Sequence, residues 1–224
     1  MGIRQATPHK RDVMKHLIIV ASGGMGRTVY SLAKECIGYG SDFDIKGFID
    51  DNLKALDGFS NYPALLGTIK DYRPQPDDVF VSSIGNTRIN RLVCDSLKKR
   101  GAKFIPLIHQ RAVVRSNAVI GDGSIICEFA TIGADAKVGC NCLVQAYACV
   151  AHDCVVGDYV RIDTHCTCVG GVEIKDGAMI HTSAVLSHNV VVEENAVVGA
   201  CSFVIRRVKA GTTVTGNPAR RLNK

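Results

Sequence analysis

The sequence contains no tryptophan and few aromatic residues of any kind. Aromatic side chains make up 6% of the 224 residues, whereas hydrophobic residues make up 46%. A core must therefore be assembled mainly from valine, isoleucine and alanine. Such a composition suits repetitive β-structure better than a helix bundle with large rings at its centre.

Long apolar runs and targeting signals are also missing. No stretch approaches the roughly 20 apolar residues of a transmembrane helix, so no membrane association is expected. The first residues, MGIRQATPHKRDV, contain no apolar signal core, and Ala6 breaks the pattern for N-myristoylation. The ten cysteines are therefore interpreted as reduced thiols of a cytoplasmic protein.

Dense blocks of one charge are absent as well. The formal net charge is +6, but no Lys/Arg block with interleaved aromatics occurs, so no nucleic-acid partner is expected. A mildly basic chain remains compatible with anionic small-molecule ligands.

Residues 15–108 alternate between short apolar runs and helical patterns. Strands are predicted in HLIIVA, DIKGFID, DDVFVSSIG and AKFIPLI. Helices are predicted in RTVYSLAKECIGYG and in NTRINRLVCDSLKKRG, the second capped by Asn86 and followed by Gly101. This alternation predicts a Rossmann-like, doubly wound α/β domain, preceded by a flexible extension over residues 1–14.

A six-residue period governs the remainder, residues 109–224. Every sixth residue from Val114 to Ala210 is Val, Ile or Leu in fifteen of seventeen cases, and every sixth residue from Ala118 is small or β-branched. This is the hexapeptide repeat of a left-handed parallel β-helix, with three hexads to a triangular coil and five to six coils in all. Glycines that follow the apolar position, such as Gly121 and Gly139, are expected to ease the corners.

The same period assigns most of the cysteines to the interior. Cys142, Cys154 and Cys166 occupy the small inward position, and Cys168 the large one. We interpret them as core residues. Cys154 is two residues from His152, but its inward direction argues against a Cys–His nucleophile.

An ordered series of motifs resembles one enzyme family. The motifs are HLIIVASGGMG, GFIDD, SIGNTRI, LIHQRAVV, VAHDCVVGDYV and TGNPARRL. Together they are similar to the hexapeptide-repeat acyltransferases, and specifically to the sialic acid O-acetyltransferases and nucleotide-aminosugar N-acetyltransferases. The resemblance implies a homotrimer with acetyl-CoA bound in the groove between subunits, and no metal.

By this resemblance His152 is the general base, and Asp153 its acidic partner. Acetyl transfer to an amine or hydroxyl requires loss of a proton, and imidazole titrates near working pH. A neighbouring carboxylate fixes the tautomer and stabilises the imidazolium that forms. The third and fourth places of the hexad, which these two residues occupy, point away from the core.

The resemblance also assigns the cofactor groove, with some departures. Gly170 and Gly171 match a glycine site beside the CoA arm, and Thr182 belongs to the same groove. Arg161 stands where the family often has a second histidine, and arginine is no base at neutral pH. His165 and His181 replace the usual Gly and Ala, and their roles are left open. The basic residues near the C-terminus contact CoA phosphates or are simply solvated.

In the family the first domain holds the nucleotide-sugar acceptor. The resemblance places three segments around it, namely Ser22, Gly23 and Gly24 at phosphate or sugar, Asp50 and Asp51 at the base or ribose, and Gly85, Asn86 and Arg88 completing the pocket. Met25 replaces the usual histidine. His109, at the domain join, lines the cleft or serves as a structural hinge.

Two other kinds of site are disfavoured. NAD binding is disfavoured because the α/β domain is too short for two mononucleotide-binding halves. A zinc site of His152 and His188 in one chain is disfavoured because they lie two coils, about 9.5 Å, apart. We expect N-acetylation of a nucleotide-linked aminosugar in surface-glycan biosynthesis. O-acetylation of a sialic-acid-like sugar and a non-catalytic trimeric scaffold remain alternatives.

Overall fold

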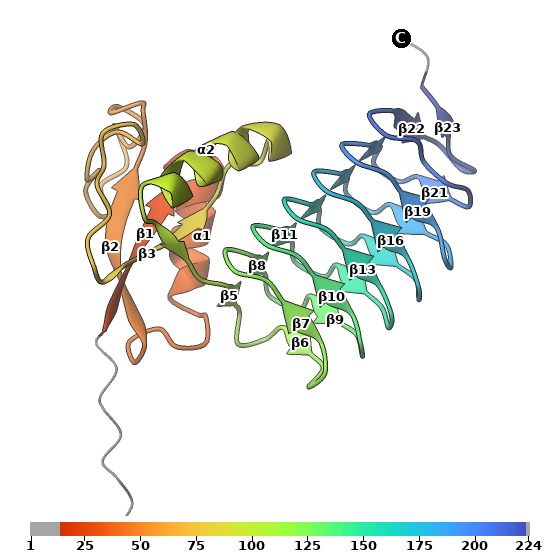
Figure 1. Ribbon diagram of the computed structural model, residues 1–224, viewed down its shortest axis with the longest axis horizontal. Coiled ribbons are helices and arrows are strands. Elements are labelled where there is room, and N and C mark those ends of the chain that lie inside the picture. The colour runs from red at the N-terminus through yellow and green to blue at the C-terminus, as the bar shows by residue number, and fades with distance from the viewer. Residues whose placement is uncertain (1–13, 223–224) are drawn as a thin grey trace, which may run out of the picture.

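The computed structural model describes residues 14–222, in two parts that lie side by side (Figure 1). A layered α/β domain is followed by a prism of stacked coils that runs to the C-terminus. The flexible extension predicted over residues 1–14 lies, except for Met14, outside the described residues.

The α/β domain is built on a four-stranded parallel sheet. Strands β1 (Lys15–Val20), β2 (Phe43–Ile49), β3 (Asp78–Ser82) and β4 (Lys103–Phe104) lie in the order β2-β1-β3-β4. Leu17 and Ile19 of β1 pack with helix α1 (Gly24–Ala33) on one face. Ile18 and Val20 pack with helix α2 (Thr87–Lys99) on the other. Helices therefore cover both faces, which confirms the doubly wound prediction.

The predicted boundaries are wrong in two places. The first helix begins at Gly24 and ends at Ala33, so the predicted segment ECIGYG forms turns instead. The predicted strand AKFIPLI is divided: β4 pairs with β3, whereas β5 (Leu107–Ile108) pairs with β8 of the prism. Pro106 separates the two pieces, since proline lacks the N–H that a continuous strand would use. The coils thus begin at Leu107.

The prism consists of short parallel strands that form three sheets. The eight-stranded sheet contains β5, β8 (Ile125–Ile126), β11 (Leu143–Val144), β14 (Arg161–Ile162), β17 (Met179–Ile180), β20 (Val197–Val198), β22 (Thr213–Thr215) and the antiparallel β23 (Arg220–Arg221). The six-stranded sheet contains β6 (Val113–Val114), β9 (Thr131–Ile132), β12 (Cys149–Val150), β15 (Thr167–Cys168), β18 (Val185–Leu186) and β21 (Phe203–Val204). The five-stranded sheet contains β7 (Val119–Ile120), β10 (Lys137–Val138), β13 (Val155–Val156), β16 (Glu173–Ile174) and β19 (Val191–Val192).

Burial follows the predicted period. Nearly all residues of the two inward series form one continuous core cluster along the axis. Residues eighteen apart are ladder partners, as Val138 and Val156 show. The left-handed β-helix is thereby confirmed.

The role predicted for the glycines after the apolar position is wrong. The corners are made by residues two places further on, such as Asp135 and Asp153, which have φ values of 59° and 60°. A Cβ on Gly121 would instead lie 2.6 Å from the Gly139 carbonyl carbon of the next coil. These glycines allow the backbones of successive coils to approach each other closely.

Three corners run along the prism, and the α/β domain occupies one of them. Helix α2 lies along the corner between the five- and eight-stranded sheets, where Thr87 Oγ1 donates to the Gly177 carbonyl at 2.8 Å and Tyr159 OH donates to Asp95 at 2.7 Å. Leu107 and Ile125 of the first coils join the core of the α/β domain. The two parts are thus packed together over a shared apolar core.

Candidate active site

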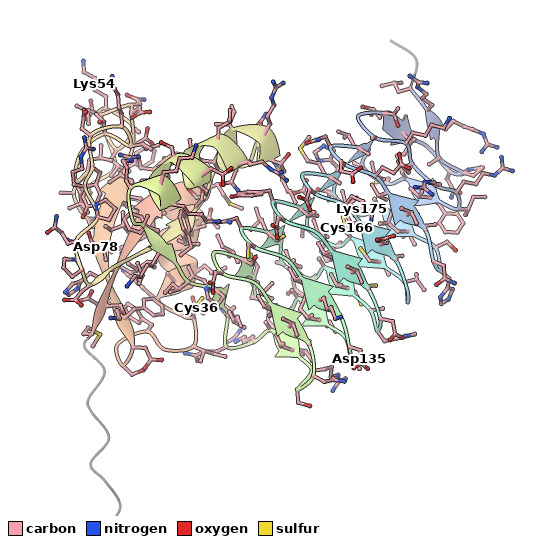
Figure 2. All side chains as sticks on the ribbon, viewed as in Figure 1. Cys36, Lys54, Asp78, Asp135, Cys166 and Lys175 are labelled. Carbon is pink, nitrogen blue, oxygen red and sulfur yellow. The ribbon has the colours of Figure 1, made fainter. Side chains whose placement is uncertain are left out.

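His152 and Asp153 form a dyad on the corner opposite the eight-stranded sheet. They lie in the turn between β12 and β13, which joins the six- and five-stranded sheets. His152 Nδ1 is 2.7 Å from Asp153 Oδ2, and the two side chains are 65% and 64% exposed. Asp135, one coil earlier on this corner, marks the edge of the prism away from α2 in Figure 2. We call this edge the base corner.

The His152 imidazole packs against Gly170. A Cβ on Gly170 would lie 2.5 Å from His152 Cε1 and 2.6 Å from Nε2, so the ring rests directly against the glycine of the next coil. Gly171 has a φ of 73° and donates its N–H to the His152 carbonyl at 3.1 Å. The structure therefore brings the two glycines and the dyad together.

The neighbouring thiols are directed into the core, as the period predicts. Cys154 is 0% exposed, and its Sγ approaches the Val169 carbonyl at 3.3 Å rather than the imidazole. Burial raises the pKa of the Cys154 thiol, and raises that of Cys166 to about 11. Both thiols are therefore protonated near neutral pH and poorly nucleophilic.

The second group of candidates lies at the carboxyl ends of the parallel strands. The strand order reverses between β1 and β3, and ligands of open α/β sheets bind at such a point. Ser22, after β1, is buried and donates both its N–H and its hydroxyl to Asp50 Oδ2, at 2.8 and 2.9 Å. Gly23 and Gly24 are exposed, and a Cβ on either residue would meet no atom within 4 Å. The loop of Gly23 and Gly24 is therefore accessible, and Asp50 fixes its start through the two hydrogen bonds from Ser22.

Asp51 is not brought together with this loop. Its carboxylate accepts the N–H of Ile69 at 2.9 Å and holds the turn after β2. With Arg73 and Arg100 it borders a different cavity, on the outer side of α2.

Asn86 and Arg88 line a cavity between α2 and the prism. Its volume is about 490 Å³, and Thr87, Arg91, Gly177, Met179 and Asn195 complete the lining. Asn86 also caps α2, because its Oδ1 accepts the Ile89 N–H at 3.0 Å. Gly85 precedes this cap, and its carbonyl accepts a hydrogen bond from Arg161 Nη1 at 3.3 Å.

Sequence reasoning missed Thr87 and Arg91. Thr87 bonds to Gly177, and Arg91 Nη2 is 3.1 Å from Asp176 Oδ2, so both tie the cavity wall to the prism. Nothing in the local pattern distinguishes them from ordinary helix residues, since their partners are 85 or more residues away.

Thr182 lies on a different corner from Gly170. It is exposed in the turn between β17 and β18, where the eight- and six-stranded sheets meet. On the same corner His165 stacks on Tyr147, with ring centroids 4.9 Å apart. The basic residues near the C-terminus line a cavity of about 320 Å³, formed with Val204, Val208 and Ala219 among others.

His109 has structural contacts. It is 4% exposed, its Nδ1 accepts the Arg111 N–H at 3.0 Å, and its Nε2 lies 3.3 Å from Glu35 of the α/β domain. Both ring nitrogens are therefore engaged where the two parts join.

Residues 14–222 contain no cluster of three or more His, Cys, Asp or Glu side chains arranged to hold a metal ion. Over the same residues, no helix is both long and apolar enough to cross a membrane.

Comparison with known proteins matches both parts of the chain. The PglD N-terminal domain family matches residues 16–97, and the bacterial transferase hexapeptide family matches residues 135–170. GDP-perosamine N-acetyltransferase of Escherichia coli O157:H7 is 33% identical over 92% of this chain and 96% of its own. UDP-N-acetylbacillosamine N-acetyltransferase of Bacillus subtilis is 32% identical over 50% of this chain and 51% of its own.

A similar solved structure supports the same assignment. The acetyltransferase domain of PglB from Neisseria gonorrhoeae, in complex with acetyl coenzyme A, superposes with a TM-score of 0.84 at 29% identity, over 94% of this chain and all of the other. The expectation of an acetyl-CoA-dependent enzyme is confirmed at the level of the family. The chain therefore belongs to the hexapeptide-repeat nucleotide-aminosugar N-acetyltransferases.

Proposed function

We propose that this protein transfers the acetyl group of acetyl-CoA directly to the amine of a nucleotide-linked aminosugar, with His152 as general base. The observation that carries the proposal is the exposed His152–Asp153 dyad set against Gly170. The substrate class is supported by the full-length similarity to an enzyme named for GDP-perosamine.

The chemistry requires one base and no covalent enzyme intermediate. The amine nitrogen attacks the thioester carbonyl carbon, His152 Nε2 takes the amine proton, and the C–S bond breaks to release CoA. Asp153 accepts a hydrogen bond from the Nδ1–H of His152, which leaves the Nε2 lone pair free to take the amine proton. The carboxylate stays ionised and stabilises the imidazolium as it forms. Gly170 and Gly171 leave room for the pantetheine arm beside the base, because neither carries a side chain.

The acceptor is assigned to the α/β domain. Gly23 and Gly24 offer open backbone at the end of β1, and Asn86 and Arg88 border the neighbouring cavity, with Arg91 as a second cation. A nucleoside diphosphate suits this combination of N–H groups and guanidinium groups.

The separation of these two sites supports an assembly that shares each active site between copies, and we propose the homotrimer as that assembly. His152 is on the base corner, whereas the Gly85 loop rests on Arg161 of the opposite, eight-stranded sheet. The width of the prism, roughly 15–20 Å for sides of six extended residues, separates them in one chain. A neighbouring copy would bring its base corner to the acceptor site, and Thr182 and Gly170 of different copies would then face one groove.

Thiol release from acetyl-CoA tests the function. The panel holds UDP-, GDP- and CMP-linked sugars, free sialic acids and a blank without acceptor. Turnover with one nucleotide aminosugar is expected. Turnover with sialic-type sugars alone would favour O-acetylation, and no turnover with any acceptor would favour a scaffold.

Mixing two inactive variants tests the shared site. His152→Asn and Arg88→Glu chains, refolded together, should regain activity, because some sites then combine an intact base corner with an intact acceptor pocket. Mixtures as inactive as the separate variants would place both groups in one chain.

We assign the enzyme to cytoplasmic surface-glycan biosynthesis, in keeping with a nucleotide-activated substrate.

A further inference from the structure

A second Asp–His dyad lies on the eight-stranded side of the prism. His181 Nδ1 is 2.9 Å from Asp163 Oδ2, a geometry close to the 2.7 Å of the His152–Asp153 pair. The environments differ, because the Asp163 side chain is 6% exposed and the Asp153 side chain 64%. The second dyad is thus built around a buried carboxylate.

Every acceptor position of Asp163 is engaged. Arg161 donates from Nε to Oδ1 at 2.6 Å and from Nη2 to Oδ2 at 3.2 Å, and Gln145 Nε2 donates to Oδ1 at 2.8 Å. With His181 this makes four hydrogen bonds, which offsets the cost of burying the charge. Such a fully satisfied network fixes the orientation of each member.

The network contacts the loop that leads into the proposed acceptor pocket. Arg161 Nη1 also donates to the carbonyl of Gly85, which precedes Asn86 of the cavity lining. Arg161 is the ladder partner of Met179, another lining residue, and His181 follows Met179 by two positions. None of the network side chains lines the cavity itself, but Met179, which does, lies two positions before His181 on the same strand face. The second dyad therefore lies beside the cavity wall.

One nitrogen of the dyad is left for a ligand. A carboxylate on Nδ1 selects the tautomer that carries its proton there, so Nε2 keeps its lone pair. Among residues 14–222, no hydrogen-bond partner lies on His181 Nε2, and the side chain is 35% exposed.

We propose that His181 Nε2 accepts a hydrogen bond from a hydroxyl or amine N–H of the acceptor sugar, with Asp163 and Arg161 as positioning residues. This assignment rests on the proposed function and adds to it a residue that determines specificity for the acceptor. His152 serves the chemical step, and His181 serves recognition.

The test separates the two nitrogens of the ring. His181→Asn keeps an amide N–H near the Nδ1 position, able to donate to Asp163, but removes Nε2. It should raise KM for the accepted nucleotide aminosugar, with GDP-perosamine as the first probe, about three- to tenfold, as for loss of one neutral hydrogen bond. The kcat and the KM for acetyl-CoA should stay within about twofold. The melting temperature should stay within a few degrees.

His181→Gln supplies an acceptor oxygen near the Nε2 position and should recover part of the affinity. His165→Asn is the matched control, because that histidine stacks on Tyr147 outside the network. An unchanged acceptor KM in His181→Asn would overturn the assignment, as would a raised KM for acetyl-CoA alone or a loss of activity that merely follows a loss of stability.

Nitrogen-15 NMR of the histidines distinguishes recognition from turnover. Adding GDP-perosamine, or a UDP-linked 4-amino sugar, should shift the Nε2 resonance of His181 and leave that of His165 in place. A shift without any turnover would contradict the proposed function while supporting recognition by His181. No shift with the sugar that is turned over would overturn the recognition role.

Discussion

The prism and the α/β domain hold their structures by contacts of different sequence range. In the prism each residue meets its counterpart eighteen positions away, and the same contact is repeated from coil to coil. In the α/β domain each contact occurs once, as between Ser22 and Asp50 or between Lys46 and Asp78. A repeated contact leaves a periodic signal in the sequence, whereas a single contact leaves none.

The groups proposed for the chemical step and those proposed for acceptor binding also owe their geometry to different features of the molecule. The base corner takes its geometry from the repeat, since its turn has the same backbone as those before and after it. The proposed acceptor site takes its geometry from the glycine loop after β1, the N-terminus of α2 and the prism. Substitutions at the base corner should therefore affect the chemical step, and substitutions at the proposed acceptor site should affect binding.

The largest expected effect is on catalysis at the base corner. His152→Asn should lower kcat about 10³-fold, or about 4 kcal/mol of transition-state stabilisation, because the proton acceptor is lost. The exposed side chain contributes little to the core, so the melting temperature and the oligomeric state should be retained. Steady-state kinetics and analytical ultracentrifugation measure both. A variant with most of its kcat would contradict the general-base role.

The next effect is on the stability of the α/β domain alone. Asp78 is fully buried and accepts hydrogen bonds from Lys46 Nζ at 2.7 Å, Tyr72 OH at 2.8 Å and the Gln75 N–H at 2.8 Å. Asp78→Ala should cost about 3 kcal/mol of unfolding free energy, since Lys46 and Tyr72 lose their partner. Hydrogen exchange should accelerate over β1 to β3 and remain slow in the prism. Equal acceleration in both parts would show that they unfold as one unit.

The same carboxyl gives a pH dependence. Burial by itself raises the pKa of Asp78, but hydrogen bonds from Lys46, from the Gln75 N–H and from Tyr72 outweigh burial and hold the pKa below its ordinary value. Its stabilising contribution is therefore present above about pH 4, the unfolded-state value, and is lost as the pH falls through the folded-state value. Urea unfolding of the unsubstituted protein and of Asp78→Asn should converge on acidification. A constant difference between them would refute this.

A smaller effect on kcat is expected from substitution of Gly170, the glycine of the next coil that contacts the His152 ring. Gly170→Ala would place a Cβ 2.5 Å from His152 Cε1, so the ring must move. We expect a loss of about 30-fold in kcat, or about 2 kcal/mol, with KM for the sugar little changed. A crystal structure of the variant would show the displaced ring. An unaltered kcat would mean that the base tolerates the shift.

The smallest effect on rate should come from Cys154. Cys154→Ala should leave kcat within about twofold, because the thiol is buried and faces the prism interior. Its cost should appear in stability instead, at about 1 kcal/mol for the small cavity. Denaturant unfolding and thiol-release assays measure the two. A large loss of kcat in a folded variant would revive the Cys–His nucleophile.

The sequence by itself determined the β-helix, its inward residues and the outward direction of His152 and Asp153. It could do so because a six-residue period fixes, for each position, whether a side chain enters the core. It also determined most elements of the α/β domain, since the capping by Asn86 and the apolar runs are local signals. It did not determine the end of the first helix or the division of the last strand between the two parts. The glycines after the apolar position were misassigned because their role depends on the next coil rather than on their own turn.

Only the tertiary structure decided which candidates meet. In the α/β domain, Ser22 donates to Asp50, whereas Asp51 accepts from Ile69 instead of contacting the glycine loop. In the prism, Thr182 and Gly170 lie on different corners. Three further residues form one hydrogen-bonded network, namely Arg161, Asp163 and His181. These outcomes depend on the packing of α2 against the prism and on which sheet each hexad enters. Such contacts join residues far apart in the chain through geometry that no local pattern records.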